Sequence, residues 1–133
     1  MNDYFHPDIP RERLLEISSI GLAHMGDAVF ELLVRCWLCA QGGATGKGLH
    51  RAAIQLVCAE SQAEKAEKIF PLLSEEERGV FRRGRNAQVH TVPHHASRAQ
   101  YGEATALEAL LGWLYLQGRT ERINELFCRM MEE

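Results

Sequence analysis

The sequence predicts an all-α domain, and three observations lead to this fold class. Apolar residues recur at intervals of three and four positions in several long stretches, as they do along one face of a helix. Residues that cap helices, or glycines and prolines that end them, bound these stretches. No stretch shows the alternation of polar and apolar residues that is typical of a half-buried strand.

The first long helix is expected from Ser18 or Ser19 to the Gly42-Gly43 pair. Either serine side chain can accept a hydrogen bond from a backbone N–H of the first turn. The two glycines end the helical spacing of apolar residues. Asp27 lies within this helix, in the otherwise apolar run GLAHMGDAVF.

A second helical stretch is expected over about 47–70, where Pro71 ends it. Ser74 and Glu77 then form the sequence pattern of a capping box, in which each residue bonds a backbone N–H of the other. They predict a short helix that ends near Gly84.

The remaining chain is expected to hold a loop and two further helices. Residues 85–100 have no clear apolar period and include Pro93, which favours a loop. Residues 102–117 are rich in alanine and leucine and form a helix that Gly118 closes. A last helix is expected over 120–131, beginning at a threonine followed by a glutamate.

Length and composition indicate one globular domain over positions 1–133. Hydrophobic residues make up 46% and charged residues 25%, which is too apolar for a disordered chain. The amino end lacks the apolar segment of a signal peptide, and no stretch approaches the roughly 18 to 20 apolar residues of a membrane span. We therefore expect a cytoplasmic protein without membrane contact, whose four cysteines are reduced and mostly buried.

The charge of the chain is unevenly distributed. The net charge of −3 argues against a protein that coats nucleic acid through its overall charge. Residues 78–101, however, contain five arginines, three histidines and no acidic residue. One locally basic segment is therefore expected on a mildly acidic protein.

Two acidic residues, Asp27 and Glu108, each lie inside an apolar helical pattern. A carboxylate left buried and unpaired would cost several kcal/mol, so it must be neutralised, paired or bound to a metal ion. Gly26 and Gly112 would let the two helices cross with close backbones, which would bring the acids together. Such a pair suits Mg²⁺, which takes one or two protein carboxylates beside water and phosphate oxygens.

An alternative stays open at this point, because helical patterns place side chains on faces with limited precision. Each acid could instead pair with an arginine or point to solvent at the edge of a helix. Glu31 is the contrasting case, since Arg35 follows it by four positions and can pair with it.

Three motifs in this order, LAHMGDAVFELLVR, RRGRNA and ATALEALLGWLYL, resemble the ribonuclease III catalytic domain. The resemblance covers about 18–118 and is to the Mini-ribonuclease III group, which has no separate domain for binding double-stranded RNA. It implies an all-helical, homodimeric, Mg²⁺-dependent endoribonuclease that cleaves double-stranded RNA and processes the ends of precursor 23S ribosomal RNA. It also implies that Asp27 is the catalytic aspartate and that Glu108 is the catalytically required, metal-binding glutamate.

The chain departs from the larger ribonuclease III enzymes at three positions. Their further acids, four residues before the aspartate and three before the glutamate, are here Ala23 and Thr105, as in the Mini group. Metal binding should therefore be weaker. Glu103 is either an outer helper of the site or a first-turn acid favoured by the helix dipole. His24 stands where those enzymes carry an aromatic residue that packs into the partner subunit, so it is either a dimer-interface residue or a surface histidine.

The resemblance also implies RNA contacts at the end of the short helix and in the loop after it. Guanidinium groups can bind phosphates there, and an amide can bind a 2′-hydroxyl, so that recognition follows the A-form shape of the duplex. A solvated arginine cluster that offsets the helix dipole is the alternative. The candidate RNA-binding residues are Arg82, Arg83, Arg85, Asn86, His90 and His94.

Other motifs carry weaker signals. His50 and Gln62 match the LH and QA positions of the family, and we interpret both as structural residues. Cys36 and Cys39 could join the loop histidines in a zinc site, but a pair of thiols in the core of a helix explains this spacing better.

Two functions from other classes remain as alternatives. One is a non-catalytic, dimeric RNA-binding factor for ribosome assembly on the same scaffold, and the other is a structural helical dimer without RNA. The lack of a separate RNA-binding domain predicts weak affinity for bare duplexes and substrate presentation with the help of ribosomal proteins.

Overall fold

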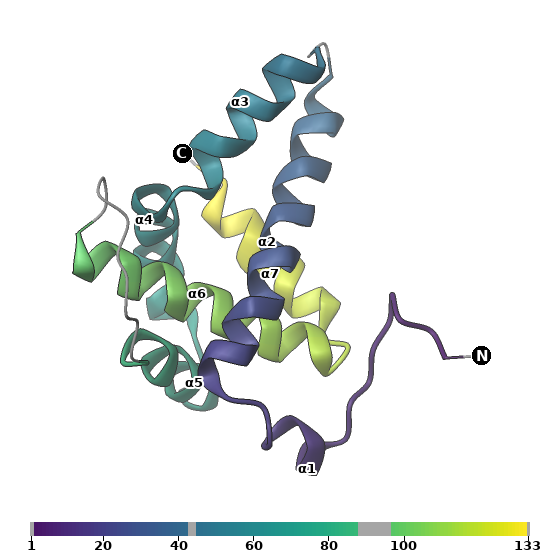
Figure 1. Cartoon of the computed structure of the whole chain (residues 1–133), viewed down its shortest axis with the longest axis vertical. Coiled ribbons are helices and arrows are strands. Elements are labelled where there is room, and N and C mark those ends of the chain that lie inside the picture. The colour runs from purple at the N-terminus through teal and green to yellow at the C-terminus, as the bar shows by residue number, and fades with distance from the viewer. Residues whose placement is uncertain (1, 43–44, 88–96, 133) are drawn as a thin grey trace.

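The computed structural model describes residues 2–42, 45–87 and 97–132, and every regular element in these ranges is helical (Figure 1). This confirms the all-α fold class. In chain order the elements are α1 (Arg11–Leu14), α2 (Ser19–Gln41), α3 (Gly46–Val57), α4 (Ala59–Ile69), the 3-10 turn η1 (Phe70–Leu72), α5 (Glu75–Arg85), α6 (Arg98–Leu116) and α7 (Thr120–Met130).

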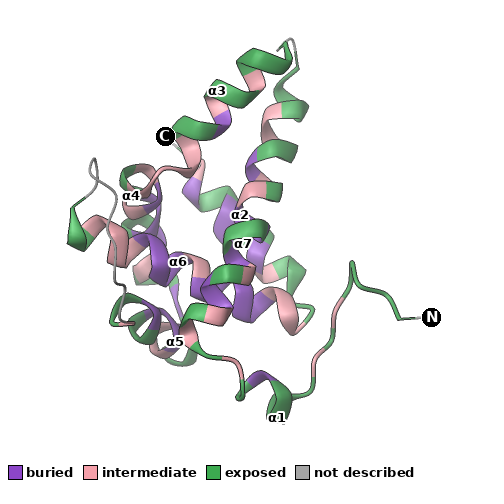
Figure 2. Cartoon of the chain, viewed as in Figure 1, coloured by how far each residue is buried: buried purple, intermediate pink, exposed green. Residues whose placement is uncertain are grey.

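Helix α6 is the centre of the fold, because α2, α4, α5 and α7 all pack against it. Figure 2 shows that its middle is buried, whereas the other helices bury only one face. This explains why the sequence of α6 is apolar nearly all round. The core leucines of α6 have no exposed surface; they are Leu107, Leu110, Leu111 and Leu114.

The predicted caps are present. The Ser18 side chain accepts a hydrogen bond from the backbone N–H of Gly21 at 3.0 Å, which fixes the start of α2. Ser74 and Glu77 form the expected capping box at the start of α5. Gly42 and Gly118 end α2 and α6 with φ angles of 78° and 75°, a backbone conformation that favours glycine.

The second helical stretch was predicted as one helix over 47–70 and is in fact two. Cys58 adopts an extended conformation, with φ −66° and ψ 156°, so that α3 and α4 meet there at an angle. The Gln62 side chain closes this junction, since its Nε2 donates to the backbone carbonyl of Val57 at 2.8 Å. A tertiary contact thus replaces the helical hydrogen bonds that the bend removes.

Two further boundaries differ from the prediction. Helix α6 begins at Arg98, because Ser97 and Gln100 form a capping box that lies within the predicted loop. The short helix α1 was not predicted; only Leu14 of its four residues is buried.

The expectation of mostly buried cysteines is wrong. All four are free, but Cys36, Cys39 and Cys128 are exposed, and only Cys58 is partly covered. The second half of α2 projects from the body of the molecule together with α3, as Figure 1 shows. Few side chains cover this hairpin, so its outer face, with Cys36 and Cys39, stays in contact with solvent.

The amino-terminal segment is tied to the end of α6. The Ile9 N–H donates to the Leu116 carbonyl at 2.9 Å, and the Tyr115 hydroxyl donates to the Phe5 carbonyl at 2.6 Å. Across the described ranges, none of the helices combines the length and apolar character needed to cross a bilayer.

Candidate functional site

The site lies where α2 crosses α6, and two glycines set the closeness of that crossing. A Cβ atom on Gly26 would overlap the Glu108 carbonyl group and lie 2.9 Å from the Glu108 Cα. A Cβ atom on Gly112 would overlap the Leu22 carbonyl oxygen. The close backbone approach predicted from the two glycines is therefore present.

This crossing places Asp27 and Glu108 side by side, one from each helix. Both carboxylates line a small open cavity of about 180 Å³. Asp27 is exposed at the surface, and Glu108 is partly buried. The other lining residues are Ile20, Ala23, His24, Tyr101 and Thr105.

The surroundings of Glu108 raise its pKa to about 8. Burial of the carboxyl group is the largest cause, and the charge of Asp27 and a hydrogen bond with it also raise the pKa. Hydrogen bonding from Gln62 acts in the opposite direction. At neutral pH the Glu108 carboxyl group therefore holds a proton unless a positive charge compensates for its loss.

Neither acid is neutralised by an arginine. No ion pair within residues 2–42, 45–87 and 97–132 includes Asp27 or Glu108. Glu31, in contrast, pairs with Arg35 at 3.1 Å as predicted. The two acids of the cavity thus face each other instead of separate cations.

The positions where the larger enzymes carry further acids face the same cavity. Ala23 and Thr105 are buried in its wall, and the Thr105 hydroxyl donates to the Tyr101 carbonyl at 3.0 Å. Glu103 fits neither interpretation given to it above. It lies in the second turn of α6, outside the cavity lining, and pairs with Arg85 at 3.3 Å.

Four of the candidate RNA-binding residues lie together at the carboxyl end of α5. Arg82, Arg83, Arg85 and Asn86 are all exposed, and Asn86 is the C-cap residue. The Arg85 guanidinium also lies 5.9 Å from the centre of the Phe81 ring, so part of this side chain is held by the protein itself. His90 and His94 lie outside the described residues.

Two features of the cavity were not found from the sequence. Tyr101 is part of the lining but had been placed in a loop, because α6 was predicted to begin at residue 102. Its spacing of four and seven positions from Thr105 and Glu108 would have put all three on one helix face. Gln62 adjoins Glu108, although the sequence gave no reason to connect them.

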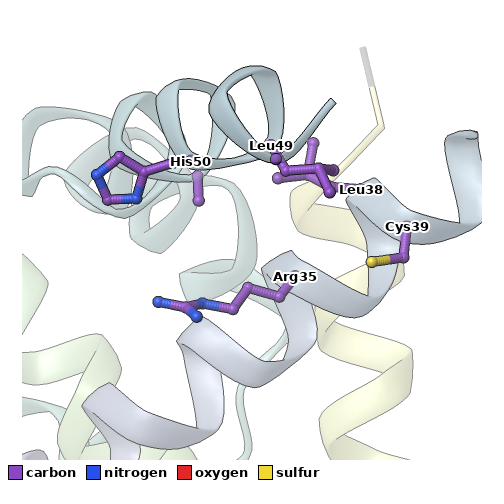
Figure 3. Close-up of a pocket in the computed structure, with 7 residues that line it drawn as sticks. Arg35, Leu38, Cys39, Leu49 and His50 are labelled. Atoms are coloured by element: carbon purple, nitrogen blue, oxygen red, sulfur yellow. The ribbon is translucent and has the colours of Figure 1, made fainter. Parts of the chain in front are cut away.

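A larger cavity, of about 380 Å³, separates α2 from α3 (Figure 3). Arg35 and Cys39 of α2 face His50 and Leu49 of α3 across it. No acidic side chain lines this cavity, so it lacks the carboxylate oxygens that Mg²⁺ prefers. Among the described residues, no three side chains of histidine, cysteine, aspartate or glutamate gather as a metal site, which leaves the zinc alternative without support.

Residues 21–119 match the model of the Ribonuclease III domain, a span that contains both carboxylates and the arginine-rich end of α5. The chain belongs to the ribonuclease III family. Among curated members of the family, it is 41% identical over 128 residues to the Mini-ribonuclease 3 of Thermoanaerobacter sp., covering 94% of this chain and 90% of that protein. It is 42% identical to the Mini-ribonuclease 3 of Symbiobacterium thermophilum, covering 84% of this chain and 86% of that protein.

A crystal structure of a Fusobacterium nucleatum protein has a similar fold, with a TM-score of 0.79 and 33% identity over 84% of this chain and 86% of that chain. As a member of the ribonuclease III family, the chain is an endoribonuclease that acts on double-stranded RNA. Enzymes of the ribonuclease III family generally depend on a divalent metal ion. Family membership thus favours the enzyme over the non-catalytic RNA-binding factor.

Proposed function

We propose that this endoribonuclease is a single catalytic domain over residues 1–133 that uses Mg²⁺, held by Asp27 and Glu108, to hydrolyse both strands of an RNA duplex. Its natural substrate is the duplex stem at the ends of precursor 23S ribosomal RNA in the cytoplasm. The observation that carries the proposal is the meeting of two carboxylates from separate helices in one open cavity, with neither paired to an arginine.

The residues of the cavity fit a hard divalent cation. Burial and the neighbouring Asp27 charge hold the pKa of Glu108 at about 8, and a cation between the two carboxylates would relieve their repulsion. Both donors are carboxylate oxygens, which are the preferred protein ligands of Mg²⁺. When bound, Mg²⁺ would supply Lewis acidity at the phosphodiester and a more acidic water molecule.

The protein itself fixes the geometry. Gly26 and Gly112 set the separation of α2 and α6, and with it the spacing of the two carboxylates. Asp27 presents its carboxylate at the exposed mouth of the cavity, and Glu108 presents a second one from the partly buried wall. One phosphodiester of the backbone can therefore approach both groups from the solvent side.

Contacts away from the cleaved bond position the RNA. Arg82 and Arg83, exposed at the end of α5, bind backbone phosphates, and Asn86 bonds a 2′-hydroxyl group. Arg85 joins them, with its side chain steadied by Glu103. In the loop that follows, His90 and His94 extend this surface.

The working unit is a homodimer with one site per subunit. His24 and Ile20 are exposed at the edge of the cavity, so that a second copy packed on this edge would lie beside the site. Two sites related by a two-fold axis can cut the two strands of one duplex. Each cut leaves a 5′-phosphate and a 3′-hydroxyl, and ribosomal proteins help to present the rRNA stem.

The test is cleavage of a precursor 23S rRNA end stem by wild type, Asp27→Asn and Glu31→Gln, each with Mg²⁺ and with EDTA. Glu31→Gln is the matched control, because it removes one negative charge from the same helix, one turn away. We expect cleavage by wild type and Glu31→Gln only with Mg²⁺, and none by Asp27→Asn. Cleavage by Asp27→Asn at the wild-type rate would contradict the assignment. Equal cleavage of an unrelated duplex would contradict the choice of rRNA stem.

A further inference from the structure

Gln62 of α4 is a buried polar side chain whose hydrogen bonding is only half satisfied. It is 3% exposed, and its Nε2 donates to the Val57 carbonyl at 2.8 Å. Its Oε1 is also buried but has no hydrogen-bond partner in the described part of the chain. A buried acceptor without a partner costs about 1–3 kcal/mol, so its retention calls for an explanation.

The explanation lies in the neighbour of this amide. Helix α4 packs against α6, and the Gln62 side chain adjoins the Glu108 carboxyl group. Hydrogen bonding from Gln62 lowers the pKa of Glu108, against the effects of burial and Asp27. The amide therefore interacts with the side of Glu108 that the cavity does not use.

We propose that Gln62 is a positioning residue, which ties the Glu108 carboxyl group to the junction of α3 and α4 and so holds it in the orientation that binds the divalent cation. This inference rests on the proposed metal-binding role of Glu108. Metal ligands are commonly oriented by such outer hydrogen-bonding partners, whose loss typically costs 10-fold to 100-fold in metal affinity.

The chemistry of a primary amide suits this role. The Val57 carbonyl uses one N–H of Nε2, which leaves the second N–H and the Oε1 acceptor for a carboxyl group. An apolar side chain would fill the same space without orienting Glu108. A glutamate would add a third negative charge to the site.

A purely structural glutamine offers a clear contrast. If Gln62 served only to bond the Val57 carbonyl, its loss would lower stability and leave cation binding unchanged. Gln117 provides the matched control, because its Nε2 donates to the Trp113 carbonyl at 2.9 Å, at the far end of α6.

The experiment measures Mn²⁺ binding to the full chain without RNA, by electron paramagnetic resonance, for wild type, Gln62→Met, Gln62→Asn, Gln117→Met and Glu108→Gln. We expect the affinity for Mn²⁺ to fall at least tenfold in Gln62→Met, to stay unchanged in Gln117→Met and to be lost in Glu108→Gln. Gln62→Asn keeps an amide but is one methylene too short to reach both partners, so it should also bind more weakly. It supplies the comparison if Gln62→Met does not fold.

The outcomes separate this inference from the proposed function. Wild-type affinity in Gln62→Met, or in Gln62→Asn if that is the variant that folds, would overturn the role of Gln62 while Glu108 kept its own. Wild-type Mn²⁺ binding and cleavage by Glu108→Gln would instead overturn the proposed metal site, and the role of Gln62 with it.

Discussion

Replacing Gly26 by alanine should separate α2 from α6 and pull the two carboxylates of the site apart. The new Cβ atom would overlap the Glu108 carbonyl group and lie 2.9 Å from the Glu108 Cα. Carbon atoms in contact are normally about 3.5–4.0 Å apart, so the helices must move by roughly 1 Å. The atoms in the way are backbone atoms, which no change of rotamer can move aside.

The magnitude follows from two opposing effects. Alanine gains about 1 kcal/mol over glycine in helix propensity. Overpacking of a tight core typically costs about 1–3 kcal/mol, and a clash with backbone falls at or beyond the upper end. We expect a net loss of about 2 kcal/mol, which lowers the Tm by roughly 8 °C in a domain of this size. A displacement of about 1 Å at the site should lower the cleavage rate about 100-fold.

The assay compares Gly26→Ala with Gly79→Ala by thermal denaturation and by cleavage of a duplex RNA. Gly79 is also inside a helix, but a Cβ atom there would meet only the flexible end of the Arg83 side chain, at 3.3 Å. This control should gain stability from helix propensity and cleave normally. A Tm for Gly26→Ala equal to that of Gly79→Ala would refute the claim that backbone contact at Gly26 sets the crossing.

Two further predictions concern charge. In metal-free buffer the protein should lose stability as pH rises from about 5 to about 8, because the pKa of Glu108 is higher in the folded than in the unfolded state, and Asp27→Asn should flatten this dependence in thermal melts at several pH values; an unchanged slope would contradict the coupling of the two acids. Arg122→Met should cost about 3–5 kcal/mol in urea denaturation at pH 7, since it strands the buried Glu77 carboxylate that Arg122 bonds at 2.8 Å. The pKa of Glu77 is lowered, so the stability from this pair is present above its unfolded pKa and is lost in acid, where the variant and the wild type should converge; a cost that stayed constant down to pH 3 would be inconsistent with an ion pair.

The part of the site that the sequence predicted depends on local patterns. A glycine beside Asp27 and a glycine one turn after Glu108 mark the two helix faces that meet, and the crossing follows from that small volume. The caps at Ser18, Ser74 and Gly118 are likewise local, because each satisfies backbone groups within its own turn.

The parts that were missed depend on tertiary contacts. Nothing in the sequence around Cys58 breaks a helix; the bend exists because α3 and α4 pack on different neighbours and the Gln62 amide stabilises it. The exposure of Cys36 likewise depends on where the hairpin of α2 and α3 points, which no pattern within α2 reveals. The role we propose for Gln62 needs the packing of α4 on α6 and so could not come from spacing alone.

The arrangement of the carboxylates on α2 and α6 also bears on when the enzyme becomes active during its own synthesis. Glu108 follows Asp27 by 81 residues (108 − 27), which a ribosome takes roughly 4 to 16 s to add. A nascent chain therefore carries an isolated aspartate while it is still beside ribosomal RNA, and a chain truncated before α6 never gains the second acid. Completion and folding of the polypeptide thus switch on its ability to cut RNA, without a separate inhibitor or pro-segment.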